Sequence, residues 1–225
     1  MLVYHGGYAL IEEIELEKCR PYTDFGKGFY VTKYKNHAEN WAKKSGKRNN
    51  TNGYITVFNY SNTSFVDSIC KKKKFDGYTE EWLDFIVRSR NVDSVEQVHD
   101  FDIVEGPVAN DKVQNRLEYY LAGKISRTDF LKELTYHEET HQICFCTIAS
   151  LQTLKFIDRD LTVYIEQISE NILSNIVKDK NIDVYSASDI FYSSKTFADI
   201  ADKKLEYYKQ DWQIIYRKLQ NELGY

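Results

Sequence analysis

The spacing of the apolar residues changes near residue 157, and this change constrains the fold more than any other feature of the chain. Ahead of it, the clearest pattern is the strict alternation of side chains over Tyr54–Tyr60, which is typical of a strand with a buried face. After it, apolar residues recur at every third or fourth position, at Leu161, Ile165, Ile168, Ile172 and Ile176. That stripe predicts a long amphipathic helix. We therefore expect an α+β unit over residues 1–157 and a helical unit over residues 158–225.

Shorter patterns predict the remaining elements of both units. Strands are expected over 2–5, 28–32, 54–60, 101–105 and 142–147. Helices are expected over 36–45 with Gly46 as the stop, after the cap Thr79, over 113–121, and after the cap Ser126. In the second unit, short helices around 190–191 and 197–200 precede a last helix that ends at Gly224. No strand is expected after residue 157.

The balance of charge limits the partners of the chain. Its 225 residues include 30 Lys and Arg against 34 Asp and Glu, for a formal net charge of −4. This balance excludes a nucleic-acid binder that is basic throughout, although a local basic patch stays compatible with it. The run Lys71–Lys74 is more typical of a solvated loop than of a phosphate-binding patch.

The chain also lacks the signals of a membrane or secreted protein. No window approaches 18 apolar residues, so we expect no contact with a membrane. The first residues have neither a basic nor an apolar leader region, which predicts a cytoplasmic protein and leaves a specialised secretion route open. In a reducing cytosol the four cysteines are expected to be free thiols, and Cys144 and Cys146 share one face of a predicted strand.

One motif points to zinc but stands in the wrong context. Residues 137–141 spell His-Glu-x-x-His, in which two His on one helical face bind zinc and the Glu acts as base. Glu139 puts a charge where such helices are apolar, and the residues after His141 alternate like a strand. We predict a polar turn that leads into a strand, and no metal site.

A second group of residues points to a flat ligand with a sugar. His5-Gly6 ends the first predicted strand, and Gly26-Lys27-Gly28 precedes Tyr30 at the second. Glycines let the backbone approach a planar ligand, an aromatic ring can stack on it, and a His can bind sugar hydroxyls. A tight turn beside a core tyrosine explains the same letters, so this reasoning leaves both interpretations open.

These residues carry a resemblance to a known superfamily. His5-Gly6 and Phe25–Tyr30 resemble the His-Gly and Gly-x-Gly-x-Tyr signatures of the ADP-ribosyltransferases. The likeness is to the His-Tyr-Glu branch, which includes the poly(ADP-ribose) polymerases and the diphtheria-type toxins. A fuller set is similar to an uncharacterised bacterial family assigned to that superfamily, over roughly residues 1–156, and comprises Val3–Gly6, Asp24–Thr32, Asp102–Val108 and Gln142–Thr147.

The resemblance implies a fold and an activity. The fold would be α+β, an ADP-ribosyltransferase-like split β-sandwich with flanking helices, followed by the helical C-terminal unit. NAD would be the substrate, and a mono-ADP-ribosyltransferase would move ADP-ribose to a macromolecular acceptor, protein or nucleic acid, or hydrolyse NAD. A role as a bacterial toxin or effector is compatible with this resemblance.

The resemblance also implies roles for single residues. His5 would hold ribose hydroxyls, the Gly6 backbone would bind the nicotinamide carboxamide, and Gly28 would belong to the cofactor-binding loop. Tyr30 would stack on the nicotinamide ring, with Tyr34 as a second ring on its other side.

The chain departs from the superfamily at its third motif. The expected acid is replaced by Gln142, which can orient a hydroxyl but supplies no charge to a cationic ribose. Glu138 or Glu139, in the preceding turn, would then be the catalytic carboxylate, which either supplies this charge or deprotonates the acceptor. The alternative is a catalytically silent module that binds NAD or a protein, with the C-terminal helices as the surface for a protein partner.

Overall fold

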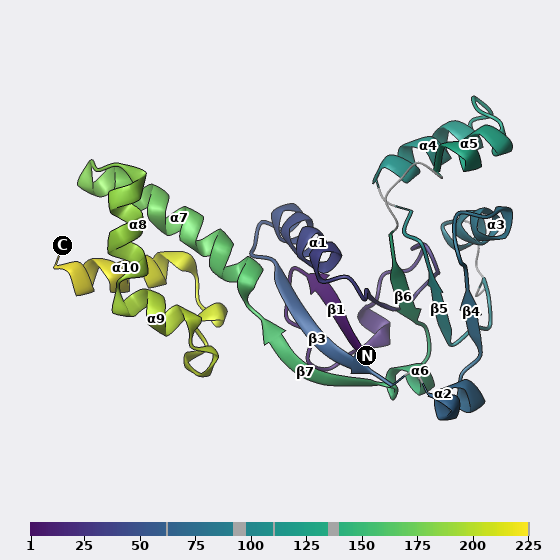
Figure 1. Cartoon of the computed structure of the whole chain (residues 1–225), viewed down its shortest axis with the longest axis horizontal. Helices are drawn as coiled ribbons and strands as arrows, with labels where there is room; N and C mark the ends of the chain where they lie inside the picture. The colour runs from purple at the N-terminus through teal and green to yellow at the C-terminus, as the bar shows by residue number, and fades with distance from the viewer. Residues whose placement is uncertain (62, 92–97, 110, 135–139, 225) are drawn as a thin grey trace. The chain divides into compact units, whose positions relative to one another are not determined.

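The computed structural model describes residues 1–61, 63–91, 98–109, 111–134 and 140–224 (Figure 1). These residues form two compact units. The first comprises Met1–His5, Ile11–Ala38 and Thr56–Asp158, and the second comprises Gly6–Leu10, Glu39–Ile55 and Arg159–Tyr225. The predicted boundary near 157 thus lies beside the start of the last segment, but the second unit also takes two segments from the first 55 residues.

A four-stranded sheet with the order β2-β6-β5-β4 forms the centre of the first unit. Its strands are β2 (Phe29–Val31), β6 (Gln142–Phe145), β5 (Ile103–Gly106) and β4 (Lys72–Lys74). β6 runs antiparallel to both of its neighbours, and Cys144 stands opposite Tyr30 on one side and Val104 on the other. β4 runs parallel to β5 at the edge.

A three-stranded sheet has the order β1-β3-β7, with β1 (Leu2–Gly7), β3 (Tyr54–Tyr60) and β7 (Leu154–Asp160). A single bridge joins Tyr4 of β1 to Thr32, directly after β2. Side chains of the two sheets share one core, in which Val3 and Phe58 meet Phe29, Ile143 and Phe145. The mixed α+β class is therefore confirmed, with two small sheets that pack against each other.

Helices cover the other face of the four-stranded sheet. The helices of the first unit are α2 (Ser64–Ile69), α3 (Glu80–Ser89), α4 (Asp111–Leu121), α5 (Arg127–Leu134) and α6 (Ile148–Leu151), while α1 (Lys35–Arg48) starts in it. Trp82 and Ile86 of α3 and Phe130 of α5 pack with Val104 and Cys144 in a second core. Alternate residues of β5 and β6 thus enter different cores, as the pleat of a strand requires.

The helical part of the second unit follows the predicted stripe. Its helices are α7 (Thr162–Lys180), α8 (Val184–Tyr192), α9 (Lys195–Ala201) and α10 (Trp212–Leu223). Ile168, Ile172 and Ile176 are buried against Phe191 and Leu219, and Leu161 is the residue that caps α7. None of the helices in the described ranges has both the length and the apolar character that a membrane span needs.

Two local predictions are confirmed at the level of single hydrogen bonds. The Thr79 side chain accepts a hydrogen bond from the Trp82 amide at the start of α3, and Ser126 Oγ accepts one from the Asp129 amide at 3.1 Å. Gly224, at φ +76°, ends α10 in the left-handed conformation that glycine tolerates best.

The lysine run is the clearest local error of the sequence analysis. Lys72–Lys74 form the edge strand β4, where we expected a loop. The ammonium groups of Lys72, Lys73 and Lys74 pair with Asp67, Glu81 and Asp76 respectively, so the run does not repel itself. Lysines are also suited to an edge, because a charged edge discourages pairing with another chain.

Two further predictions are wrong for reasons of packing. α1 continues through Gly46 to Arg48, so Gly46 does not end the helix. The glycine is instead required for packing, because a Cβ at this position would come 2.7 Å from Gly53 N. β7 runs to Asp160, three residues past the point after which no strand was expected. Its sequence includes Lys155, Asp158 and Arg159, and this charge hid the strand.

Gly28 carries the first testable prediction. A Cβ on Gly28 would collide with Cys144 Sγ and lie 2.7 Å from Phe145 O, so Gly28→Ala is expected to destabilise the fold by about 1–3 kcal/mol. Gly77→Ala is the matched control, since a Cβ there meets nothing within 4 Å. Urea unfolding of both variants measures the difference, and equal midpoints would contradict the packing role of Gly28.

Candidate functional site

The hydroxyl of Tyr30 organises the loop before β2. Tyr30 Oη donates to Gly26 O and accepts from the Phe25 amide and from Thr23 Oγ1, each at 2.8 Å. Gly26 makes this turn possible, with φ at +78°. Burial raises the pKa of Tyr30 well above its usual value, so the side chain stays a neutral phenol. Tyr30 as a whole residue is partly exposed.

A buried carboxylate lies in the same loop. Asp24 Oδ1 accepts hydrogen bonds from Nε and Nη2 of Arg90, the residue that caps α3. Asp24 Oδ2 accepts from the Ala109 amide and from Gln142 Nε2, both at 2.7 Å. Both oxygens are thus satisfied, as a charge only 4% exposed requires.

Gln142 is the first residue of β6 and belongs to this network. Its amide nitrogen donates to Asp24 and, at 3.3 Å, to Pro107 O. Every hydrogen bond between this side chain and the described residues starts from that nitrogen, so the amide oxygen can accept from a ligand hydroxyl. A nearby negative charge on the donor side makes that oxygen a better acceptor.

His5 is tied to the backbone of Tyr30. Its Nδ1 lies 2.7 Å from Tyr30 O, and because a carbonyl only accepts, the ring proton is on Nδ1. The ring stacks on Phe29 with centroids 4.5 Å apart. Burial lowers the pKa of His5, and the neutral ring therefore presents Nε2 as an acceptor.

The structure also joins a pair that the sequence analysis missed. His141 Nε2 lies 3.1 Å from Glu105 Oε1, while His141 Nδ1 accepts from the Lys33 amide at 3.4 Å. The hydrogen bond from His141 lowers the pKa of Glu105 and keeps it a carboxylate. Glu105 lies near the end of β5, and His141 directly precedes β6, which pairs with β5. The sequence alone does not give the register of these two strands, so it could not predict the pair.

The predicted site residues are brought together in part. His5, Tyr30 and Gln142 are connected through the Tyr30 backbone and the Thr23–Gly26 loop. Tyr34 instead lies against His37, His141 and Lys33, and no ring contact joins it to Tyr30 within the described part of the chain. Gly6 is a buried residue of β1 and Gly28 packs on β6.

His137, Glu138 and Glu139 lie outside the described residues. Their assigned roles, including that of a catalytic carboxylate, therefore stay predictions. Across the described ranges no group of three or more His, Cys, Asp or Glu side chains is arranged to hold a metal ion.

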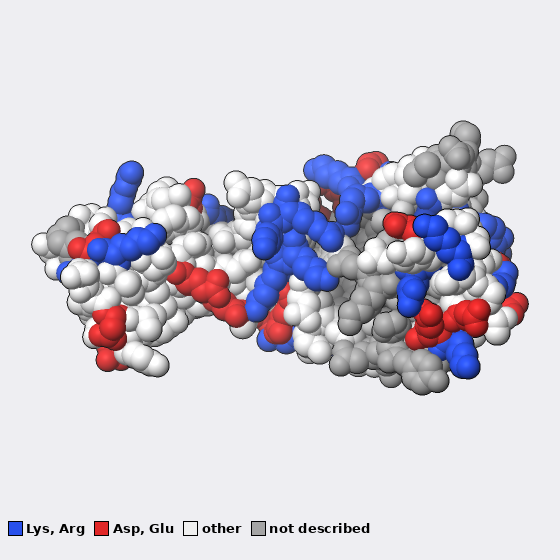
Figure 2. All heavy atoms as spheres, turned by 90° about the horizontal axis from the view of Figure 1, so that it is seen from above, with Lys and Arg blue, Asp and Glu red and all other residues white. Residues whose placement is uncertain are grey.

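Two surface features contain none of the predicted site residues. Figure 2 shows Lys and Arg side chains gathered over α1, whose sequence includes Lys43, Lys44, Lys47 and Arg48.

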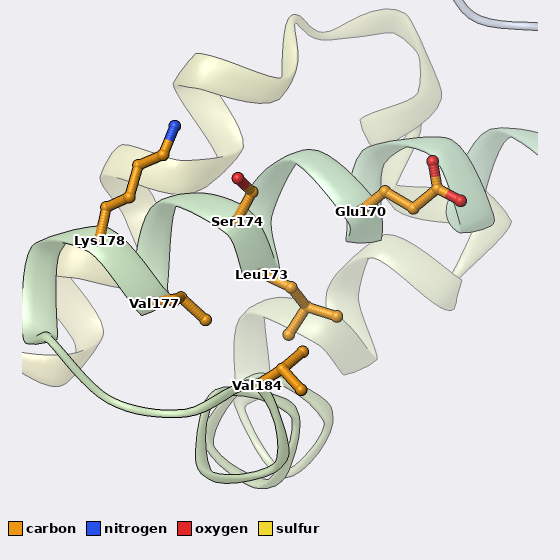
Figure 3. Close-up of a pocket in the computed structure, with 6 residues that line it drawn as sticks. All are labelled: Glu170, Leu173, Ser174, Val177, Lys178 and Val184. Carbon is orange, nitrogen blue, oxygen red and sulfur yellow. The ribbon is translucent and has the colours of Figure 1, made fainter.

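In the second unit, a mostly apolar hollow lies on α7 and α8, where Leu173 and Val184 point toward each other (Figure 3).

Comparison with known proteins supplies a family. Residues 1–156 match the family model described as "Protein of unknown function (DUF3990)". The chain belongs to this family. The matched segment of the DUF3990 protein contains His5, Tyr30, Asp24 and Gln142. No curated protein and no solved structure shows a significant match.

Arg90 gives a test of the Asp24 network. Arg90→Met leaves a buried carboxylate without its cation and is expected to cost about 3 kcal/mol of unfolding free energy or more. Arg88→Met, on the exposed side of α3, is the control and should cost about 0.5 kcal/mol or less.

A double variant separates charge from packing. If the unpaired charge of Asp24 causes the loss, Asp24→Asn combined with Arg90→Met should recover part of it, as measured by urea unfolding. Equal stability of the Arg90→Met and Arg88→Met proteins would show that the ion pair contributes nothing.

Proposed function

We propose that this DUF3990 protein binds NAD as a substrate and acts as a mono-ADP-ribosyltransferase-like protein. The observation that carries the proposal is that hydrogen bonds tie His5 to the Tyr30 backbone, and both the Tyr30 hydroxyl and Gln142 to the Thr23–Gly26 loop. His5 and Tyr30 carry the resemblance to the superfamily, and Gln142 stands at the position of its third motif, where the chain departs from it. The two packed sheets support the finer part of the proposal, an ADP-ribosyltransferase-like split β-sandwich.

The chemistry of the proposed reaction assigns each residue a task. The bond between nicotinamide and ribose C1′ breaks, its electron pair stays on nicotinamide, and the ribose becomes cationic. Water or an acceptor then attacks C1′ and loses its proton. His5 Nε2 and the Gln142 amide oxygen would accept hydrogen bonds from ribose hydroxyls, and the Tyr30 ring would stack on nicotinamide.

Gln142 acts in this proposal together with Asp24. The carboxylate of Asp24 polarises the Gln142 amide, so that its oxygen carries more negative charge toward the ribose. Through this polarisation, Gln142 and Asp24 would supply part of the negative charge that a carboxylate supplies directly in the His-Tyr-Glu branch. Glu138 and Glu139 remain the proposed source of a full charge. The proposed acceptor of ADP-ribose is a protein or a nucleic acid.

A catalytically silent NAD-binding module is the second candidate. The observation that favours it is that Gln142 is neutral, while the Asp24 charge beside it is already balanced by Arg90. Such a module would bind NAD with the same residues and release no nicotinamide.

NAD binding is the first test of the proposal. We expect calorimetry to show binding, with His5→Ala and Tyr30→Ala each weakening it about fivefold, since a hydrogen bond or a stacked ring contributes roughly 1 kcal/mol. Tyr185→Ala is the matched control, because Tyr185 is 81% exposed in the second unit. Unchanged affinity in folded His5→Ala and Tyr30→Ala proteins would refute the proposed site.

Substitution of Gln142 tests the catalytic step. Gln142→Ala should lower nicotinamide release about a hundredfold, in line with the loss of one contact to a charged transition state. Gln142→Glu should also lose activity and stability, because its carboxylate would face Asp24 where an amide now donates. Gln152→Glu, at an exposed position, is the control for an added charge.

Labelled NAD distinguishes the two candidates. The chain is incubated with NAD labelled on the adenylate part, alone and with cell lysate, and both nicotinamide release and labelled macromolecules are followed. Release supports the enzyme, while binding without release in either mixture supports the silent module. A higher turnover of Gln142→Glu than of the natural chain would show that a carboxylate is simply missing at residue 142.

A further inference from the structure

Two thiols and an imidazole gather at the end of β6, where Cys144 lies opposite Tyr30 in the neighbouring strand. Cys144 Sγ and Cys146 Sγ lie 3.4 Å apart on one face of the strand. Cys144 is fully buried, whereas Cys146 is partly exposed. The ring of His99, from the segment before β5, lies close to Cys146. A solvent-accessible thiol, Cys146, thus lies beside a buried thiol, Cys144.

His99 is held firmly in this position. Its Nε2 donates to Phe25 O at 2.9 Å, and its Nδ1 accepts from the Phe101 amide at 3.1 Å. The Cys146 amide in turn donates to Asp102 O at 2.8 Å, which fixes the backbone beyond the strand. Hydrogen bonds to the backbone therefore fix both the His99 ring and the main chain at Cys146.

The surroundings stabilise a negative charge on Cys146. The hydrogen bond from Cys144 and the nearby His99 lower the pKa of Cys146 to about 6, against the opposing effects of burial and the Asp102 carboxylate. Burial raises the pKa of Cys144 well above its usual value, and burial likewise raises the pKa values of Cys19 and Cys70. At neutral pH the nucleophilic thiolate is thus confined to one of the four cysteines.

We propose that Cys146 is a modification site for oxidants of the peroxide class, and that Cys144 captures the oxidised form as a disulfide. The Cys146 thiolate attacks one peroxide oxygen, the O–O bond breaks, and the products are a sulfenic acid and, after protonation, water or an alcohol. Cys144 sulfur then attacks Cys146 sulfur and loses its proton. The S–O bond breaks and the hydroxyl leaves as water.

The geometry also sets the character of this disulfide. The sulfur atoms must approach from 3.4 Å to about 2.05 Å, while residues two apart on a strand have Cα atoms about 6.6 Å apart. That separation is at the upper limit for a disulfide, so the bond is strained and easily reduced. Cys146 stands one residue beyond the end of β6, where the backbone can adjust without breaking the ladder.

Alkylation tests the thiolate without any oxidant. The full chain is treated with iodoacetamide from pH 5 to 9, and the labelled cysteines are followed by peptide mass spectrometry. Cys146 should react half-maximally near pH 6 and, at pH 6, roughly tenfold faster than a small thiol of ordinary pKa. His99→Gln should move the midpoint upward, which a merely structural role of His99 would not do. A midpoint for Cys146 above pH 8 would overturn the proposal.

Peroxide tests the capture by Cys144. One equivalent of hydrogen peroxide, followed by a thiol block, should give a Cys144–Cys146 disulfide that dithiothreitol reverses. Cys144→Ser should leave a sulfenic acid that dimedone traps at Cys146, and Cys146→Ser should leave Cys144 unmodified. Cys70→Ser is the control and should change nothing. A disulfide of Cys146 with Cys19, or oxidation at Cys70 ahead of Cys146, would overturn the assignment.

Discussion

The buried carboxylate of Asp24 is the constraint on which the first unit depends. It accepts hydrogen bonds from three parts of the chain, at Arg90, Ala109 and Gln142. A charge taken out of water is costly unless nearly every lone pair is satisfied, so these segments must meet in one arrangement. Because the same loop is held by Tyr30 Oη, the geometry of the candidate site and the stability of the fold rest on the same bonds.

Sequence reasoning succeeded where the determinants are local. The alternation of Tyr54–Tyr60, the cap at Thr79 and the stripe along α7 depend on neighbours within a few residues, and each is found as predicted. It failed where distant residues decide. Lys72–Lys74 become a strand only because β5 and three carboxylates lie beside them, and β7 carries too much charge to be recognised alone.

The same distinction applies to the candidate site. His5, Tyr30 and Gln142 could be selected from the letters, since each belongs to a motif with a chemical meaning. The hydrogen-bond partner of Gln142 could not be predicted, because Asp24 is 118 residues away along the chain. The pair of Glu105 and His141 was missed for this reason too, and so was the contact of Tyr34 with His141.

The position of β7 has a practical consequence for work on this family. The segment that matches DUF3990 ends at residue 156, whereas β7 runs from Leu154 to Asp160 beside β3. A chain truncated at the family boundary would lose more than half of this strand and expose backbone donors and acceptors of β3 to solvent. Unpaired strand edges recruit other chains, and the shortened protein would then aggregate for a reason unrelated to its activity. Expression of the family segment by itself should therefore continue to Asp160.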